Sequence, residues 1–299
     1  MRALDDHAEP RADGVQNQRG LFATASRGLK RASPAAWFGV IVVLLYVSVA
    51  LLAPVLAPYG ESEIVSSQSY APWSEKFIFG TDQLGRDLLS RLIYGARNTI
   101  GIALLSTVLA FAIGGALGIL AALWGKTFDL LLSRLVDALM AVPQLIFVLI
   151  LLSVFGNSIP CLILVVAALT ATQVFRLARS VAMNVVVMEY VEDAKLRGEN
   201  LVWIVSREIL PNILPTLIAE FGMRFCFVFL TFSALSFLGL GIQPPTADWG
   251  SMVRESATLI SYGDITPLLP AGAIALLTVA VNFVVDWFLH SASGLRDEH

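Results

Sequence analysis

Six long apolar stretches alternate with more polar segments along the chain. Each stretch has close to the roughly 20 residues that an α-helix needs to cross the hydrocarbon core of a bilayer. The stretches cover residues 35–57, 98–124, 133–155, 159–177, 213–236 and 267–290. Because a helix satisfies its own backbone polar groups inside lipid, the pattern predicts an all-α membrane protein with six transmembrane helices.

Lysine and arginine are distributed unevenly between the two sides of these predicted helices. The N-terminal tail carries six of them and the 178–212 loop carries four, whereas the 237–266 loop carries only Arg254. The 58–97 segment also carries four, but five acidic residues offset them. Positively charged residues favour the cytoplasmic side of a membrane protein. We therefore predict that both termini and the 178–212 loop are cytoplasmic.

The same pattern divides the chain into five parts. The tail has no sustained apolar period, so we expect most of it to be disordered. The parts are a cytoplasmic tail (1–34), a first transmembrane helix (35–57), an extracytoplasmic segment (58–97), a five-helix core (98–290) and a short cytoplasmic tail (291–299). The core contains the cytoplasmic loop 178–212 and the extracytoplasmic loop 237–266.

Composition supports the membrane class. Hydrophobic residues make up 57% of the chain and the mean hydropathy is +0.75. The net charge of −3 gives no basic surface of the kind that binds nucleic acid, so we expect no nucleic-acid partner. Both cysteines, Cys161 and Cys226, lie in apolar runs, which indicates buried small side chains and not a disulfide or a metal site.

The 178–212 loop is unusually charged for this chain. Its segment EYVEDAKLRGENLVWIVSREILPN has eight charged residues in 24. Ser180–Leu196 has the apolar spacing of a helix, and Gly198 suits the left-handed position that follows a helix. Asn200 can cap a second helix, which we expect to end at Pro211, with Asn212 capping the fifth membrane helix. Two short helices joined at a glycine predict a docking module for a cytosolic partner.

The sequence FGTDQLGRDLLSRLIYGARNT precedes the second membrane helix. Asp82 is a candidate N-cap, and the leucines after it repeat at helical spacing. We therefore predict a short amphipathic helix on the outer face that Gly95 separates from the membrane helix. Such a helix would orient the membrane helix or, as a second interpretation, contact the substrate.

The sequence SFLGLGIQPPTADWG follows the fifth membrane helix. Pro244 and Pro245 stop helix propagation, and Trp249 before Gly250 offers an aromatic side chain at the membrane interface. A stiff loop of this kind predicts either a contact with an external partner or a re-entrant connector.

Charged and small residues inside the apolar runs are also informative. Glu220 and Arg224 are four residues apart in the fifth membrane helix, so they share a face and can form an ion pair. Because charge inside a bilayer is costly, the pair either lines a translocation path or stabilises helix packing. Gly114 and Gly118 form a GxxxG pattern, which predicts a helix-packing surface.

No pattern in the sequence indicates an enzyme. LWGKT, at Leu123–Thr127, lacks the earlier glycine that a nucleotide-binding P-loop requires. The three histidines have no metal-ligand spacing, and no nucleophile is paired with a base. We expect no cofactor or metal in this chain.

The 178–212 loop resembles the coupling loop of binding-protein-dependent ABC importers. The motif of that loop is E-A-A, three residues, G, and about ten residues to I/L-P. The matching residues are Glu192, Asp193, Ala194, Gly198, Leu210 and Pro211, with Asp193 in place of the middle alanine. The resemblance implies that these residues dock on an ATPase subunit.

Two outer segments extend the resemblance, which covers the chain from about residue 35 to its end. FGTDQLGRD and SFLGLGIQPPTADWG are similar to signature segments of the second, C-type permease subunit of dipeptide, oligopeptide and nickel importers. The matching positions of the first segment are Gly80, Thr81, Asp82, Gly85, Arg86 and Asp87. In the second segment, Pro244, Pro245, Trp249 and Gly250 become candidate contacts for a binding protein.

The resemblance implies a multi-pass permease subunit in the bacterial cytoplasmic membrane. It implies a heterodimer with a related permease, one or two ATPase subunits that bind ATP and Mg, and an extracytoplasmic binding protein. Peptides are the expected solute, with nickel or another small solute as the alternative. An autonomous secondary transporter or a membrane scaffold is the alternative of a different class, although the intramembrane charges are too few for a proton relay.

Overall fold

The computed structural model describes residues 33–293, so the predicted disorder of the N-terminal tail falls almost entirely outside the described residues. The described part is helical. Its helices are α2 (Pro34–Leu51), α3 (Ala53–Leu56), α4 (Leu88–Leu123), α5 (Lys126–Met140), α6 (Gln144–Phe155), α7 (Ile159–Val186), α8 (Glu189–Leu196), α9 (Leu201–Ile204), η2 (Val205–Ile209), α10 (Leu210–Phe237), α11 (Trp249–Ser256), η3 (Ala257–Tyr262) and α12 (Leu268–Ser293). Two isolated bridges are its only β-structure.

Five helices in this range are long and apolar enough to cross a membrane, namely α2, α4, α7, the continuous α9–α10 helix and α12. The bent pair of α5 and α6 supplies a sixth if it counts as one span. The all-helical class is therefore confirmed, with five or six membrane spans.

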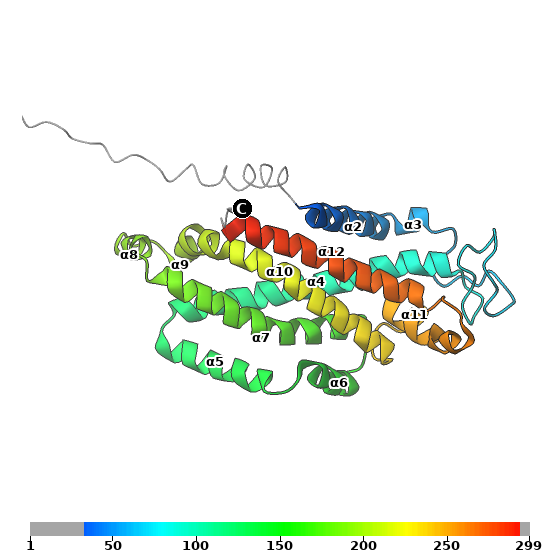
Figure 1. The fold of residues 1–299 in the computed structure, drawn as a ribbon. Coiled ribbons are helices and arrows are strands. Elements are labelled where there is room, and N and C mark those ends of the chain that lie inside the picture. The colour runs from blue at the N-terminus through cyan, green and yellow to red at the C-terminus, as the bar shows by residue number, and fades with distance from the viewer. Residues whose placement is uncertain (1–32, 294–299) are drawn as a thin grey trace, which may run out of the picture.

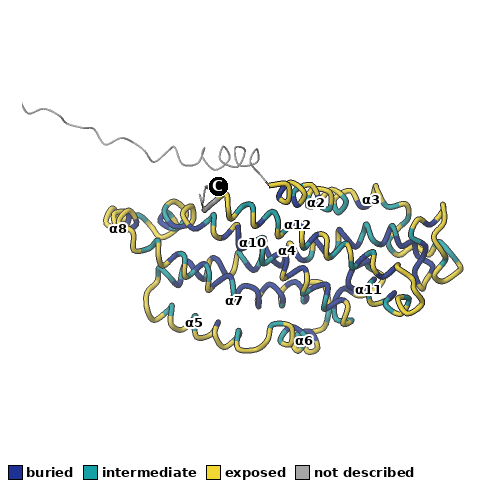
Figure 2. The backbone as a smooth tube through the Cα atoms, viewed as in Figure 1, coloured by how far each residue is buried: buried dark blue, intermediate teal, exposed yellow. Residues whose placement is uncertain are grey.

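The long helices lie alongside one another in an elongated bundle (Figure 1). α7 lies between α4 and α10 on one side and the α5–α6 pair on the other, and α12 lies between α2 and α10. Burial follows this order, since 61% of the most apolar part of α7 is buried against 17% in α2 (Figure 2). The outer faces of α2 and of the α5–α6 pair remain for lipid or another subunit.

The predicted span at residues 133–155 is not one continuous helix, although the bent pair can still count as one span. α5 and α6 meet at an angle of 87° across residues 141–143. Pro143 has no N–H to continue the helical hydrogen bonds, and its ring disfavours helical geometry at Val142. Hydropathy does not report such a break, because the residues on both sides of it are apolar.

The prediction of a separate short helix before the second membrane helix is wrong. α4 is continuous over 36 residues, about 54 Å at 1.5 Å per residue. Its N-cap is Asp87, which accepts a hydrogen bond from the Ser90 N–H, and not Asp82. Gly95 does not break the helix. A Cβ there would lie 2.6 Å from Trp249 Cδ1, so the glycine makes room for the indole.

Gly114 and Gly118 pack α4 directly on α7, which confirms the prediction of a packing surface. A Cβ at Gly114 would lie 2.4 Å from the Ala171 carbonyl oxygen, and one at Gly118 would lie 2.7 Å from the Phe175 carbonyl oxygen. The two backbones thus approach more closely than a larger residue would allow.

The substitution Gly114→Ala should destabilise the protein, whereas the neighbouring Gly115→Ala should not. The new methyl group at position 114 overlaps a backbone carbonyl, which costs about 1–3 kcal/mol. At Gly115 a Cβ meets nothing within 4 Å, so alanine gains about 0.5–1 kcal/mol over glycine in a helix. Thermal unfolding of the purified protein in detergent measures both effects. Equal stability of the two variants would contradict the close packing of α4 on α7.

Candidate functional site

The 178–212 loop occupies one end of the bundle, between α7 and α10 (Figure 1). Gly198 follows α8 with a φ of +79°, in the left-handed region that glycine adopts without strain. Asn200 caps α9, because its side-chain oxygen accepts a hydrogen bond from the Trp203 N–H at 2.8 Å. The predicted roles of both residues in the backbone are confirmed.

The first helix of the loop differs from the prediction. Ser180–Leu196 is not one helix, because α7 ends at Val186 and α8 begins at Glu189. The break begins within three consecutive valines, Val185 to Val187, whose β-branched side chains are poor helix formers. It also reorients α8 so that Val191 and Ala194 are completely buried against the ends of the long helices.

The second helix of the loop does not end at Pro211, and Asn212 does not cap α10. The chain continues from α9 through the π-helical turn η2 into α10, and the Leu210 N–H donates to the first carbonyl of η2. This wider turn accommodates the proline ring, which would clash with the preceding turn of a regular α-helix. Asn212 donates instead from its side-chain amide to the Glu208 carbonyl.

The loop therefore buries one face and exposes the other. Its buried face includes Ala194, Ile204 and Ile209, each at most 1% exposed. Leu196 and Val202 are about 80% and 78% exposed, respectively, although both are apolar. Of the residues predicted to dock, only Ala194 is buried, and the exposed ones are Glu192, Asp193, Gly198, Leu210 and Pro211.

Val187 and Leu201 of the same loop are exposed as well, and grouped apolar side chains rimmed by polar ones are typical of an interaction surface. The motif did not include Leu196 or Val202. The only feature of the sequence that could have indicated them is that both are apolar residues in a highly charged segment. The exposed apolar part of the loop thus extends beyond the residues of the motif.

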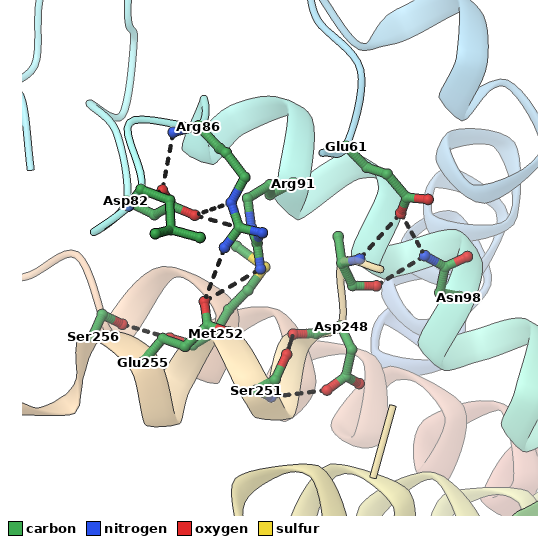
Figure 3. A network of polar contacts seen from close by, with 12 residues as sticks. Glu61, Asp82, Arg86, Arg91, Asn98, Asp248, Ser251, Met252, Glu255 and Ser256 are labelled. Atoms are coloured by element: carbon green, nitrogen blue, oxygen red, sulfur yellow. Dashed lines mark hydrogen bonds and ion pairs between the residues drawn. The ribbon is translucent and has the colours of Figure 1, made fainter. Parts of the chain in front are cut away.

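The opposite end of the bundle contains a buried charge cluster of Asp82, Arg86, Arg91 and Glu255 (Figure 3). Asp82 Oδ2 lies 2.6 Å from Arg86 Nε and 3.3 Å from Arg91 Nη1. Glu255 Oε2 lies 3.6 Å and 3.3 Å from Nη2 of the same two arginines. No side chain of the four is more than 12% exposed. Two positive and two negative charges therefore balance where little water reaches them.

The predicted signature residues build the turn that carries this cluster. Gly80 and Gly85 have φ values of +76° and +78°, and a Cβ at either would lie within 2.4 Å of a carbonyl oxygen. Thr81 accepts a hydrogen bond from a backbone N–H ten residues earlier, and Asp82 accepts two backbone N–H groups within the turn. With Asp87 as the cap of α4, the signature fixes this turn against the helix.

A second polar group lies beside the cluster and joins α11 to α4 (Figure 3). Glu61 Oε2 accepts hydrogen bonds from Asn98 Nδ2 at 3.0 Å and from the Ala247 N–H at 3.1 Å. Asp248 caps α11 by accepting from the Ser251 N–H at 2.8 Å. Burial raises the pKa of the Asp248 carboxyl above its ordinary value, and the hydrogen bonds that it accepts oppose this shift. The loops at this end are therefore held by polar contacts to both helices.

Trp249 and Gly250, two of the four candidates for contact with a binding protein, are buried within this chain. Trp249 is 2% exposed and donates from Nε1 to the Leu92 carbonyl at 2.9 Å. Gly250 is buried as well. Pro244 and Pro245 are exposed and remain candidates for such a contact. The sequence predicts Trp249 at the membrane interface, because no neighbouring residue indicates the helices that enclose it.

The predicted ion pair of Glu220 and Arg224 is present within α10. Arg224 Nη1 also donates to Gln173 Oε1 of α7. Gln173 Nε2 donates to Gln144 Oε1 at 3.1 Å, and Gln144 Nε2 lies 3.4 Å from Thr170 Oγ1. We call these five residues the polar chain. The sequence pattern does not indicate the two glutamines, because neither side chain is ionisable.

Comparison with known proteins places the chain in a family. Residues 114–291 match the family described as the binding-protein-dependent transport system inner membrane component. Residues 25–72 match the N-terminal TM domain of oligopeptide transport permease C.

Several curated relatives match over most of their length. The chain is 35% identical over 265 residues to the di/tripeptide transport system permease protein of Pseudomonas aeruginosa, covering 87% of this chain and 85% of the relative. It is 31% identical over 268 residues to the dipeptide transport system permease protein of Haemophilus influenzae, covering 88% of each. It is 35% identical over 280 residues to a putative peptide transport system permease protein of Brucella suis, covering 93% and 90%.

The fold and the loop geometry define a multi-pass membrane protein with a surface-exposed, partly apolar loop at one end of its bundle. The chain belongs to the family of inner membrane components of binding-protein-dependent transport systems. It is therefore a permease of the inner membrane, and the family predicted from the coupling-loop and signature motifs is confirmed.

Proposed function

We propose that this chain is one of two permease subunits of an ATP-driven importer of short peptides. The relatives named above are di/tripeptide, dipeptide and peptide transport permeases, and they support peptides as the solute. In this proposal both termini and the 178–212 loop face the cytoplasm, and the charge cluster lies on the outer side.

The proposed complex contains a related permease, one or two ATPase subunits that bind ATP and Mg, and an extracytoplasmic binding protein. The exposed apolar faces of α2 and of the α5–α6 pair offer area for the second permease and for lipid. The exposed Pro244 and Pro245 are the proposed contact for the binding protein.

The observation that carries the proposal is the two-sided packing of the 178–212 loop. Its inner face forms one core with α4, α7 and α10, while Leu196 and Val202 remain exposed. Because protein interiors are close-packed, a displacement of the loop is transmitted to the helices that it contacts. The ATPase would thus drive α7 and α10, which carry four of the five residues of the polar chain.

Reconstitution of the complex in proteoliposomes tests this function. With binding protein outside and ATP inside, we expect accumulation of a labelled dipeptide that stops when the ATPase subunits are omitted. ATP-driven uptake of nickel but not of peptides would contradict the proposal that the solute is a peptide. Uptake by this chain alone would contradict the importer mechanism and support an autonomous transporter.

A further inference from the structure

The polar chain lies at mid-height of the bundle. Gln173 is the fifteenth of the 28 residues of α7, and Glu220 and Arg224 are the eleventh and fifteenth of the 28 residues of α10. Polar side chains at this depth are costly unless they are paired or serve a pathway. The ion pair of one glutamate with one arginine therefore does not explain why the glutamines also lie at this depth.

The break between α5 and α6 lies at the same level. Gln144 begins α6 immediately after the break and contacts Gln173. A cavity of about 120 Å³ adjoins the break, and its lining includes Pro143, Gln144, Thr172 and Gln173. Non-helical backbone at membrane depth occurs where protein buries it or where it lines a water-filled cavity. Residues 141–143 are exposed in this chain, so the rest of residues 33–293 does not bury the break, and the adjoining cavity gives it contact with water.

Arg224 retains a donor for a ligand. Its Nε donates to Glu220 and its Nη1 to Gln173, while Nη2 has no hydrogen-bond partner among residues 33–293. The arginine side chain is 25% exposed, whereas that of Glu220 is 10% exposed. The glutamate thus fixes the guanidinium from the buried side. A guanidinium held in this way can bind a carboxylate through charge-assisted hydrogen bonds.

The two glutamines extend this chemistry along the cavity. A side-chain amide both donates and accepts hydrogen bonds, which matches the amide groups of a peptide backbone. Peptides of different sequence share only these backbone amides and their charged termini. A path that contacts only those groups can accept peptides of many sequences, because its contacts do not depend on their side chains.

We propose that Gln144, Gln173 and Arg224 line the solute path at mid-membrane and that Arg224 binds the C-terminal carboxylate of the passing peptide. This inference rests on the proposed function. Glu220 is a positioning residue, which orients Arg224 and balances its charge. The alternative is a purely structural ion pair, which would have no preference for a carboxylate on the solute.

The test compares uptake of one tripeptide with a free carboxyl terminus and the same tripeptide with a C-terminal amide. The complete complex is used in proteoliposomes with ATP, and the ratio of the two uptake rates is measured for each variant. The same binding protein serves every variant, so its own preference cancels when the ratios are compared. A ratio is also independent of the amount of folded complex.

We expect Arg224→Gln to lower the free-acid to amide ratio about tenfold, the effect of losing one charge-assisted hydrogen bond. The double variant Glu220→Gln/Arg224→Gln should lower the ratio to the same extent, and it leaves no unpaired buried carboxylate. Arg224→Lys should retain part of the preference. Arg97→Gln is the matched control, since Arg97 is exposed on α4 and its variant should keep the wild-type ratio.

If the free-acid to amide ratio is unchanged in both the single and the double glutamine variant, the inference is overturned. The ion pair of Glu220 and Arg224 would then be purely structural. That result differs from a failure of the proposed function, in which the wild-type complex shows no ATP-driven uptake of either tripeptide.

Discussion

Replacing Arg91 by leucine should lower the melting temperature of the purified protein by about 10 °C. Arg91 is 1% exposed and lies 3.3 Å from both Asp82 and Glu255. Its loss leaves two buried carboxylates with one arginine, and an uncompensated buried charge costs about 3–5 kcal/mol. For a protein of this size that cost corresponds to a shift of roughly the stated magnitude.

The matched control is Arg97→Leu, on the same helix but exposed to solvent. Surface ion pairs contribute little, so this variant should unfold within about 2 °C of the wild type. The double variant Arg91→Leu/Glu255→Leu should recover part of the loss, because Asp82 and Arg86 then form a neutral pair. If Arg91→Leu and Arg97→Leu unfold at the same temperature, the cluster does not hold this end of the bundle together.

Replacing Val202 by aspartate should reduce ATP-driven uptake by at least about tenfold while the protein remains folded. Val202 is 78% exposed, so the change removes no core contact, but it places a charge in the proposed docking surface. A charge buried in an interface without a partner costs about 3–5 kcal/mol, which is more than a tenfold loss of binding requires. Uptake and ATPase activity of the complex, measured with thermal stability, separate a docking defect from unfolding.

Two further substitutions serve as controls for this experiment. Ile204→Asp, two residues away, alters a side chain that is 1% exposed and should lower thermal stability itself. Thr127→Asp places the same charge at an exposed position in the first turn of α5 and should leave uptake near the wild-type rate. Normal uptake with Val202→Asp would refute the assignment of this residue to the ATPase interface.

The membrane helices could be predicted because each is an apolar run of the required length. The break at Pro143 could not be recognised by hydropathy, because mostly apolar residues lie on both sides of it. The continuity of α4 through Gly95 depends on Trp249, which is more than 150 residues away in sequence. A single glycine can either end a helix or allow close packing inside a continuous helix. Only the residue that packs against it distinguishes the two cases.

The candidate sites show the same limit. Local motifs placed Gly198 and Asn200 correctly, because a left-handed glycine and an N-cap depend on neighbouring residues alone. The sequence predicts Asp82 as a helix cap, yet its carboxylate belongs to a charge cluster that includes Glu255 of a distant helix. Neutral glutamines inside apolar runs give no local indication that they contact one another. Such pairs become visible only when the helices are placed in space.

Cysteine accessibility at position 202 tests the coupling role of the loop most directly. In a background with Cys161 and Cys226 replaced by alanine, Val202→Cys would be labelled with a membrane-impermeant maleimide in inside-out vesicles. We predict rapid labelling of the permease pair alone and strong protection when the ATPase subunits are bound, while Thr127→Cys is labelled equally in both cases. Equal labelling of Val202→Cys with and without the ATPase, in a complex that still imports peptide, would contradict the proposed coupling through this loop.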